Sequence, residues 1–376
     1  MPLSLLENQP MSSEQPIQLA LEVSTLCEAH RTGTGRYAMD LICALDARPD
    51  VQVNALLYRL SRWRKRHLRY QAERSRWYLE KGPRPWGLKI DVVHGTDVRA
   101  PKWSRKPCVI TLHDVFHALP FSLGWSSAAF RTRSQTMYAR IARDADVVIC
   151  VSKTTQQDFL NNYRFPAERT VVIPHGIDSA FQPTTESQQQ VIRQRYARGR
   201  PYILHVGALV ARKNLVRFLD AYAKAGLSKD YDIVLAGGAG GASGSVQDAI
   251  IKHGLSEHVH VINYTPDEDL HGLYAAAATL SFPSLYEGFG LPVLEAMICE
   301  TPVLTSNCGG TAEVAHGHAV LVDPLDVEAI GLGLQTALSM TGKQRHAARK
   351  HAQTFTWEAT AAGTVAAYRQ AIAQLG

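Results

Sequence analysis

The chain has 376 residues, of which 45% are hydrophobic and 20% charged, and it carries a formal net charge of +6 with a pI near 9.0. Because single hydrophobic cores stop growing at about 250–300 residues, a chain of this length is expected to fold as two domains. The composition is that of a soluble globular protein, and no apolar run approaches the length needed to span a membrane.

The beginning of the chain and the cysteines indicate a cellular compartment. Residues 1–16 read as a flexible tail, and the opening M-P-L-S-L-L lacks the basic flank and apolar core of a signal peptide. The cysteines show neither a C-x-x-C pair nor metal-ligand spacing, and most lie beside apolar runs: Cys27, Cys43, Cys108, Cys150, Cys299 and Cys308. The sequence therefore predicts a cytoplasmic protein with reduced thiols.

Short apolar runs alternate with longer amphipathic segments in both halves of the chain, which is typical of parallel sheets with crossover helices. The first half contains runs at 17–23, 51–58, 90–94, 108–114, 146–152 and 170–175, and the second half at 202–207, 231–238, 258–263, 278–283, 302–306 and 318–323. The pattern predicts an α/β protein with two Rossmann-like, doubly wound domains that face each other across a cleft. The domains are expected at 17–180 and 181–356, with residues 181–200, which are polar and rich in Gln, as the linker.

The first turn between a strand and a helix reads R-T-G-T-G-R-Y and places Gly33 and Gly35 just before a helix. It is either a loop that approaches a ligand or an ordinary tight turn. The dinucleotide fingerprint is incomplete here, since Ala38 fits its third position but no acidic residue ends the second strand. This makes a nicotinamide dehydrogenase a poor interpretation.

The excess positive charge is concentrated in one short segment, with basic residues at Arg59, Arg62, Arg64, Lys65, Arg66, Arg69, Arg74 and Arg76. Trp63, Tyr70 and Trp77 recur at seven-residue spacing, which on a helix would place them on one face. A basic face with interfacial aromatic side chains favours contact with an anionic membrane surface. A solvated helix whose aromatic residues pack on the domain is an equal alternative, and no motif supports nucleic-acid binding.

Several histidines follow strands at the edge where open α/β sheets bind ligands. His113 ends the run C-V-I-T-L-H-D, and His117 follows four residues later as a weaker candidate. His94 ends another strand and is expected behind the site. At the end of the next run, Ser152 is expected to cap a helix.

Arg212 and Lys213 precede an amphipathic segment for which Asn214 is the expected N-cap. Cations at the positive end of a helix are unfavourable by a few tenths to about 1 kcal/mol each. We therefore expect these two side chains to bind an anion, since Arg can grip phosphate with two N–H groups while Lys acts as a point charge. Gly237, Gly238, Gly240, Gly241 and Gly244 are expected to form a flexible connection, with a mobile edge of the donor site as the alternative.

The most informative stretch is S-L-Y-E-G-F-G-L-P-V-L-E, residues 284–295, between a predicted strand and a helix with Pro292 in its first turn. Gly288 and Gly290 let the loop backbone approach a ligand closely, and the helix start offers unpaired N–H groups to phosphate. Glu287 and Glu295 bracket the loop and are suited to bind sugar hydroxyls. The stretch predicts a nucleotide-sugar site.

This stretch resembles the donor-site motif of family 4 retaining glycosyltransferases, whose two glutamates also stand eight positions apart. The likeness continues into T-P-V-L-T-S-N-C-G-G-T-A-E-V and back to Gly207, and its weaker parts cover almost the whole chain. It implies the GT-B fold, in which the last helix, here residues 357–376, returns to the first domain. His175–Gly176 stands where the family usually has Asn-Gly, so the role of that side chain is open.

The resemblance also implies roles for individual residues. Arg212, Lys213 and the helix start at Leu291 would neutralise the leaving diphosphate, with Gly207 nearby. Glu287 and the N–H groups of Gly288, Phe289 and Gly290 would hold the transferred sugar, and His113 would contact it from the opposite domain. Glu295 would bind the ribose, the backbone around Tyr264 would border the base, and Gly33 and Gly35 would close on the donor phosphates or the acceptor.

Neither a metal nor a cofactor is expected, because the two D-x-D patterns, at residues 144–146 and 267–269, read as structural. We expect a nucleotide sugar as donor, GDP-mannose before UDP-sugars, and a saccharide or lipid-linked saccharide of a cell-surface polysaccharide as acceptor. The alternatives are an epimerase, a phosphorylase with pyridoxal phosphate on Lys213, or a sugar-binding protein without catalysis.

Overall fold

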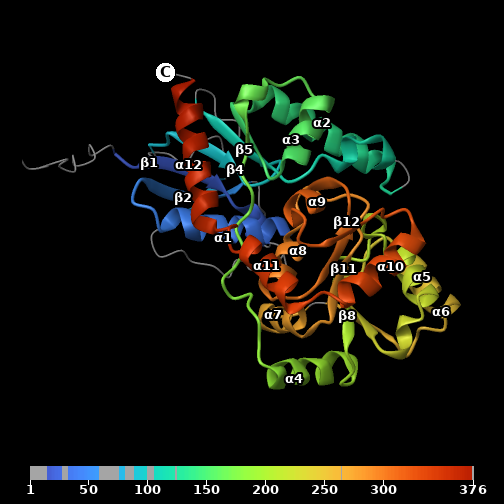
Figure 1. Ribbon diagram of the computed structural model, residues 1–376. Helices are drawn as coiled ribbons and strands as arrows, with labels where there is room; N and C mark the ends of the chain where they lie inside the picture. Colours follow the sequence, from blue (N-terminus) through green and yellow to red (C-terminus); the bar gives the residue numbers. More distant parts are fainter. Residues whose placement is uncertain are drawn as a thin grey trace, which may run out of the picture.

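The computed structural model describes residues 15–27, 33–58, 76–80, 89–99, 106–122, 125–263 and 265–374. Its first sheet has seven parallel strands in the order β3-β2-β1-β4-β5-β6-β7. They are β1 (Ile17–Glu22), β2 (Val51–Tyr58), β3 (Arg76–Glu80), β4 (Val92–Gly95), β5 (Cys108–Leu112), β6 (Val147–Cys150) and β7 (Thr170–Val172). Figure 1 shows this sheet in one domain, with the second domain beside it.

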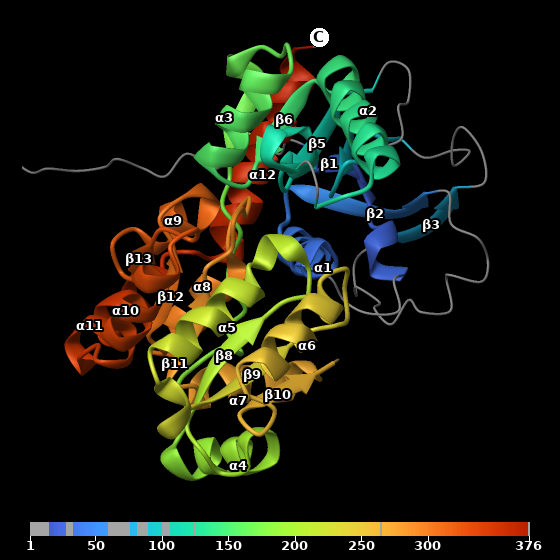
Figure 2. The same ribbon diagram turned by 90° about the vertical axis from the view of Figure 1, so that its right-hand side faces the viewer.

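The second sheet has six parallel strands in the order β10-β9-β8-β11-β12-β13. They are β8 (Tyr202–Val206), β9 (Asp232–Ala236), β10 (Val259–Ile262), β11 (Thr279–Phe282), β12 (Val303–Ser306) and β13 (Val320–Val322). All twelve predicted runs contain a strand, which confirms two doubly wound α/β domains. Figure 2 shows the two sheets stacked one above the other, with α8 and α1 between them.

Helices cover both faces of each sheet, as alternating side chains of the strands require. On the first sheet, α1 (Gly33–Asp46) and α12 (Trp357–Ala373) pack on one face, and α2 (Ala128–Asp144) and α3 (Lys153–Asn162) on the other. On the second sheet, one face is covered by α5 (Leu215–Lys224), α6 (Ser243–Lys252) and α10 (Val327–Leu338). The other carries α4 (Glu186–Ala197), α7 (Asp267–Ala276), α8 (Leu291–Ile298), α9 (Gly309–Ala315) and α11 (Gly342–Ala352).

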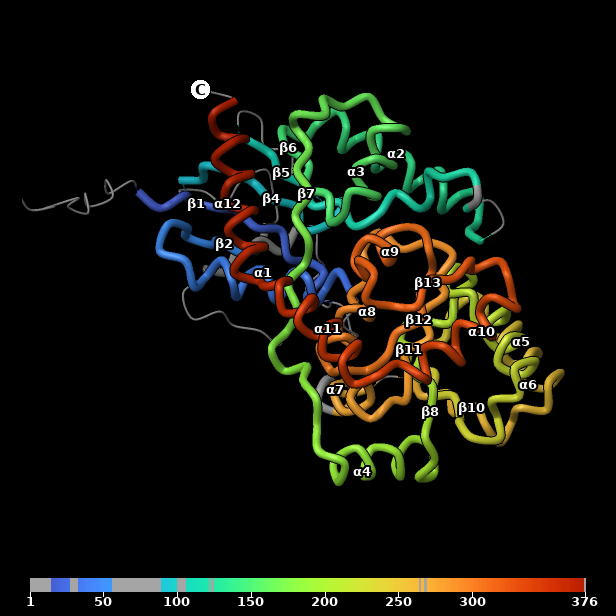
Figure 3. The backbone as a smooth tube through the Cα atoms, viewed as in Figure 1, coloured from blue at the N-terminus to red at the C-terminus, as the bar shows by residue number. Residues whose placement is uncertain are grey.

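The last helix, α12, packs in the core of the first sheet, where Ala361, Val365 and Tyr368 are buried. The chain therefore passes between the domains twice, once after β7 and again between α11 and α12 (Figure 3). The two passages touch, because Gly176 of the first lies so close to Trp357 of the second that a Cβ atom on Gly176 would stand 2.4 Å from the Trp357 backbone nitrogen.

Two expectations about local structure differ from the fold. The segment expected to be a linker contains α4, whose N-terminus is closed by a capping box between Thr185 and Gln188. In the basic segment, residues 59–75 lie outside the described residues, so membrane contact stays a prediction. Arg76 and Trp77 lie in β3, so this end of the segment is a strand and not a helix face.

The expected cap at Ser152 and the expected burial of most cysteines agree better with the structure. Ser152 is the N-cap of α3, where its side chain accepts a hydrogen bond from the Thr155 N–H. Among the described residues no cysteine forms a disulfide, and four of the six are buried, while Cys43 and Cys308 are exposed. None of the described helices has the length and apolar character needed to cross a membrane.

His94 belongs to the core that joins α12 to the first sheet. Its side chain is fully buried, with Nδ1 2.7 Å from the Tyr368 hydroxyl and Nε2 2.8 Å from Thr111 Oγ1. Burial, assisted by the nearby His113, lowers the pKa of His94 to about 3. His94 therefore supports the fold from inside the sheet and does not line the cleft.

We expect His94 to make the fold sensitive to acid. Below its unfolded pKa, about 6.5, the unfolded chain binds a proton that the folded chain excludes, so this stability is lost as pH falls toward 3. From pH 7 to pH 5 the loss at His94 is about 2 kcal/mol. Burial raises the pKa of Glu22 to about 7, so protonation of Glu22 stabilises the fold as pH falls and partly masks the effect of His94. The test therefore compares a His94 variant with the wild type. Urea unfolding at pH 7 and pH 5 measures the free energy of unfolding, which should fall less on acidification in His94→Gln than in the wild type. Equal losses would contradict the assignment.

Candidate active site

The loop from Ser284 to Gly290 leaves β11 and enters α8, as expected. Gly290 is the N-cap of α8 with φ 125°, a conformation that side chains with a Cβ rarely adopt, and proline occupies the first turn of this helix. The loop rests on the start of α9, where the Gly310 N–H donates to the Glu287 carbonyl at 2.8 Å. A Cβ atom on Gly310 would lie 2.3 Å from the Gly288 carbonyl oxygen, so the close approach requires glycine.

Glu287 is gripped by the two predicted phosphate-binding cations. Arg212 Nη1 donates to Glu287 Oε2 and Lys213 Nζ donates to Oε1, each at 2.7 Å. Burial alone would raise the pKa of Glu287, but Arg212 and Lys213 lower it to about 2. Glu287 in turn raises the pKa of Arg212, whereas burial lowers that of Lys213. Two cations face Glu287, which keeps this acid ionised, and Asp114 also acts on both cations in the direction that raises their pKa values.

This arrangement corrects the argument made for Arg212 and Lys213 from helix polarity. Both residues lie in a short 3₁₀ helix, Ala211–Lys213, and the anion that compensates them is Glu287. Asn214 stands at the N-cap position of α5 but makes no capping hydrogen bond. Its side-chain amide instead donates to the Pro283 and Pro324 carbonyls and thereby ties the cationic turn to the strand before the loop.

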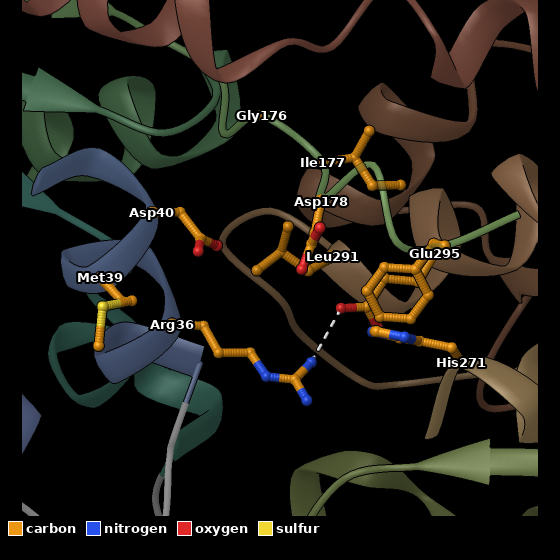
Figure 4. Close-up of a pocket in the computed structure, with 10 residues that line it drawn as sticks. Arg36, Met39, Asp40, Gly176, Ile177, Asp178, His271, Leu291 and Glu295 are labelled. Atoms are coloured by element: carbon orange, nitrogen blue, oxygen red, sulfur yellow. Dashed lines mark hydrogen bonds and ion pairs between the residues drawn. The ribbon is translucent and has the colours of Figure 1, made fainter. Parts of the chain in front are cut away.

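Glu295 lies one turn into α8 and has a partner on each oxygen. The buried Tyr274 hydroxyl donates to Oε2 at 2.5 Å, and Arg36 of α1 donates to Oε1 at 3.1 Å. Figure 4 shows Arg36 reaching across from the first domain to Glu295, with Asp40 and Asp178 beside it. Tyr274 thus orients the carboxylate, and Arg36 joins the two domains at the predicted ribose site.

His113 lies where the first domain meets the loop. Its Nε2 is 2.8 Å from the Thr96 carbonyl, and its ring packs edge-on against Tyr37 at 4.8 Å and beside His175 at 5.3 Å. Burial lowers its pKa, so the imidazole is neutral at pH 7. A Cβ atom on Gly288 would lie 1.8 Å from the His113 carbonyl oxygen, so this histidine and the loop are in direct contact.

The other histidines have different surroundings. The ring of His117 packs between those of Phe116 and Phe130, and its Nδ1 is 3.2 Å from Ser126 Oγ. His175 is buried against Tyr37, Phe289 and Trp357, and it fills the space between the two domains.

The glycines and the remaining loop residues divide into three groups. Gly33 and Gly35 lie inside the first turn of α1 and not before it. Gly207 has φ 141° and lies close to Lys213, whose Cε would be 3.0 Å from a Cβ atom on Gly207. The Phe289 side chain is part of the core of the second domain. Tyr264 lies outside the described residues, so its role stays a prediction.

The glycine-rich stretch after β9 is tightly packed at Gly237 and Gly240, whereas the Cβ positions of Gly238, Gly241 and Gly244 face open space. A Cβ on Gly237 would lie 2.1 Å from the Gly207 carbonyl oxygen, and one on Gly240 would lie 2.6 Å from that of Leu209. The Leu209 N–H also donates to the Gly238 carbonyl at 3.1 Å. These glycines let two loops of the second domain pass each other closely.

Two contacts at the site were not singled out from the sequence. Arg36 stands within the R-T-G-T-G-R-Y turn, which gave a signal for the turn but none for its partner 259 residues away. Tyr274 lies in α7 and carries no sequence signal of its own. Among the described residues, no group of three or more His, Cys, Asp or Glu side chains is arranged to hold a metal ion.

Each half of the chain matches the model of a known protein family. The model for glycosyl transferases group 1 matches residues 188–355, and that for glycosyltransferase family 4 matches residues 31–181. O-antigen chain mannosyltransferase B of Escherichia coli is 33% identical over 60% of this chain and 61% of its own length. MMP alpha-(1->4)-mannosyltransferase of Mycolicibacterium hassiacum is 30% identical over 74% of this chain and 62% of its own. The chain thus matches about three fifths of these relatives.

Solved structures agree with the fold over nearly the whole chain. Sucrose-phosphate synthase from Thermosynechococcus elongatus superposes with a TM-score of 0.76 at 21% identity, covering 95% of this chain and 100% of that one. Anabaena Alr3699/HepE, in complex with UDP and glucose, gives a TM-score of 0.72 at 19% identity over 93% and 98% of the two chains. With both halves matched by glycosyltransferase models and the GT-B fold shared throughout, the chain belongs to glycosyltransferase family 4.

Proposed function

We propose that the protein is a retaining glycosyltransferase that moves a mannosyl residue from GDP-mannose to a saccharide or lipid-linked saccharide in cell-surface polysaccharide synthesis. The observation that carries the proposal is the ion cluster of Glu287, Arg212 and Lys213, which lies directly beside the glycine loop and the start of α8. Family membership supports sugar transfer, and the two mannosyltransferase relatives favour mannose.

The site would stabilise the leaving diphosphate by fixed charges. Arg212, Lys213 and the N–H groups at the start of α8 form a positive region that exists before the substrate arrives. Preorganised charges of this kind can lower a barrier by several kcal/mol because they need no rearrangement as the bond breaks. Glu287 would bind sugar hydroxyls as an acceptor, and Glu295, oriented by Tyr274, would bind the ribose hydroxyls.

The low pKa of Glu287, which Arg212 and Lys213 hold down, argues against two roles for this carboxylate. With a pKa near 2 it has no proton to give at neutral pH, and it is too weak a base to take one from an acceptor hydroxyl. As the resemblance to family 4 enzymes implies, the acceptor proton would pass to the departing phosphate on the same face of the sugar. Lys213 is engaged with Glu287, which also disfavours it as the attachment point of pyridoxal phosphate in a phosphorylase.

A UDP-sugar donor is the second candidate, because the HepE structure of the same fold holds UDP and glucose. The donors are separated by thermal shift with GDP-mannose, UDP-glucose and UDP-GlcNAc. The true donor at 100 times its dissociation constant should stabilise the fold by about 2.7 kcal/mol. We expect the largest shift with GDP-mannose. A larger shift with a UDP-sugar would reassign the donor, and the absence of any shift would contradict the proposal.

Replacement of Glu295 by alanine should weaken donor binding more than turnover. The change removes a charged acceptor for the ribose and leaves the buried Tyr274 hydroxyl without its partner. Hydrogen bonds to charged groups contribute about 1.5–3 kcal/mol, so the dissociation constant for GDP-mannose should rise about 10- to 100-fold. Calorimetric titration measures this change, and Glu328→Ala, an exposed glutamate at the start of α10, is the control. Unchanged donor affinity would show that Glu295 is not the ribose ligand.

A further inference from the structure

We propose that Glu313 is a positioning residue whose carboxylate caps helix α3 across the cleft and so holds the glycine loop against His113. The proposal rests on the proposed function for its catalytic consequence. The cap itself is a property of the two domains and can be measured without a substrate.

The first observation is the N-terminus of α3. Its N-cap Ser152 accepts from the Thr155 N–H, which leaves other first-turn N–H groups without a partner in their own helix. The Lys153 N–H donates to Glu313 Oε1 at 2.9 Å, and the Thr154 N–H donates to Oε2 at 3.1 Å. Glu313 lies on α9 in the second domain, so a carboxylate of one domain occupies the positive end of a helix in the other.

The second observation is that the same end of α3 holds the loop. Ser152 Oγ donates to the Gly288 carbonyl at 2.5 Å, and Thr155 Oγ1 donates to it at 3.1 Å. Further along the helix, Asp158 accepts from the Tyr286 hydroxyl at 2.6 Å. Together with Glu313, these contacts attach α3 to residues on both sides of Glu287.

The third observation links Glu313 to the loop within the second domain. Helix α9 begins at Gly309, and the Gly310 N–H donates to the Glu287 carbonyl at 2.8 Å. Gly310 also lies directly against the Gly288 carbonyl. Loop and helix are therefore in contact one turn from Glu313, so that docking of Glu313 on α3 fixes the distance between the loop and His113.

The cap should favour the closed arrangement without touching the nucleotide. Loss of a capping side chain shifts a helix equilibrium about 5- to 10-fold, and we expect a shift of that size toward open domains in Glu313→Ala. Turnover of GDP-mannose should fall about 10-fold in this variant. The dissociation constant for GDP should change less than about 2-fold, because Glu313 is not among the residues proposed to bind the donor. Glu313→Gln keeps an acceptor oxygen but loses the charge, so its turnover should lie between that of the wild type and that of Glu313→Ala.

Hydrogen exchange tests the cap directly. In Glu313→Ala the amides of Lys153 and Thr154 should exchange faster, while that of Thr155, which is bonded to Ser152, should change less. Small-angle scattering of the free protein should give a larger radius of gyration for this variant. Glu328→Gln, exposed at the start of α10, is the matched control and should leave all readings unchanged.

Unchanged exchange and radius in Glu313→Ala would overturn the cap. Faster exchange with unchanged turnover, or a loss of GDP affinity equal to the loss of turnover, would overturn the positioning role. If the wild type neither binds nor cleaves GDP-mannose or UDP-glucose, the proposed function and the catalytic role of Glu313 fail together, while exchange and scattering still decide the cap.

Discussion

Replacing Glu287 with alanine should slow sugar transfer by about 100- to 1,000-fold while leaving donor affinity within a few fold. The change removes the acceptor expected to hold the sugar. It also releases Arg212 and Lys213 from their ion pairs with Glu287, so both remain able to bind the diphosphate. Initial rates with GDP-mannose and a saccharide acceptor measure turnover, and calorimetry with GDP measures affinity. A variant with near-normal rates would show that the site is assigned incorrectly.

The Glu287 variant needs a control for stability, because breaking a buried ion cluster costs about 3–5 kcal/mol of folding free energy. Rates should therefore be compared at a temperature where circular dichroism shows the variant folded. Glu287→Gln separates shape from charge, since it keeps an acceptor oxygen but leaves two cations uncompensated. We expect Glu287→Gln to remain as slow as Glu287→Ala, and full recovery of rate in Glu287→Gln would mean that charge is unimportant.

Gly288→Ala should reduce turnover by about 100-fold or more, because a near-attack geometry is lost when reacting groups are displaced by an ångström or more. The added Cβ would lie 1.8 Å from the His113 carbonyl oxygen and 2.9 Å from its carbonyl carbon, and both are backbone atoms of the other domain. The domains would have to separate to make room. Scattering should show a larger radius of gyration in Gly288→Ala even with GDP bound.

Gly241→Ala is the matched control for Gly288→Ala. Gly241 also lies in a glycine-rich loop of the second domain, but nothing stands within 4 Å of its Cβ position. It should keep normal turnover and a normal radius. An active Gly288→Ala enzyme would show that the contact between this loop and His113 is not needed during catalysis.

The sequence predicted the parts of this protein that depend on local patterns. Buried strands read as apolar runs, so every one of the twelve predicted runs holds a strand. The loop from Ser284 to Gly290 lies between strand and helix, as its glycines and the following Pro292 indicate. Strand β3 was missed because R-W-Y-L-E sits in an arginine-rich segment. Helix α4 was missed because its polar residues resemble a linker, although Thr185 and Gln188 have the spacing of a capping box.

What could not be predicted depends on residues far apart in the chain. Arg212 and Lys213 suggested a bound anion, but only the fold reveals that Glu287, about 75 residues away, supplies it. The glycines after β9 suggested only flexibility, because the close approach of Gly237 to Gly207 leaves no local mark in the sequence. The grip of Tyr274 and Arg36 on Glu295 likewise appears only when helices from both domains meet. The roles of the site residues themselves stay predictions for the variants above.

Because α12 returns to the first sheet, the core of the first domain cannot be completed until the end of the chain has been synthesised. Residues 17–172 supply every strand of that sheet, yet Tyr368, the hydroxyl partner of buried His94, is translated after the whole second domain. Until then the nascent sheet exposes an apolar strip that Val365 and Tyr368 will cover. Chaperones that recognise unfinished hydrophobic surfaces would find one there throughout synthesis of the second domain.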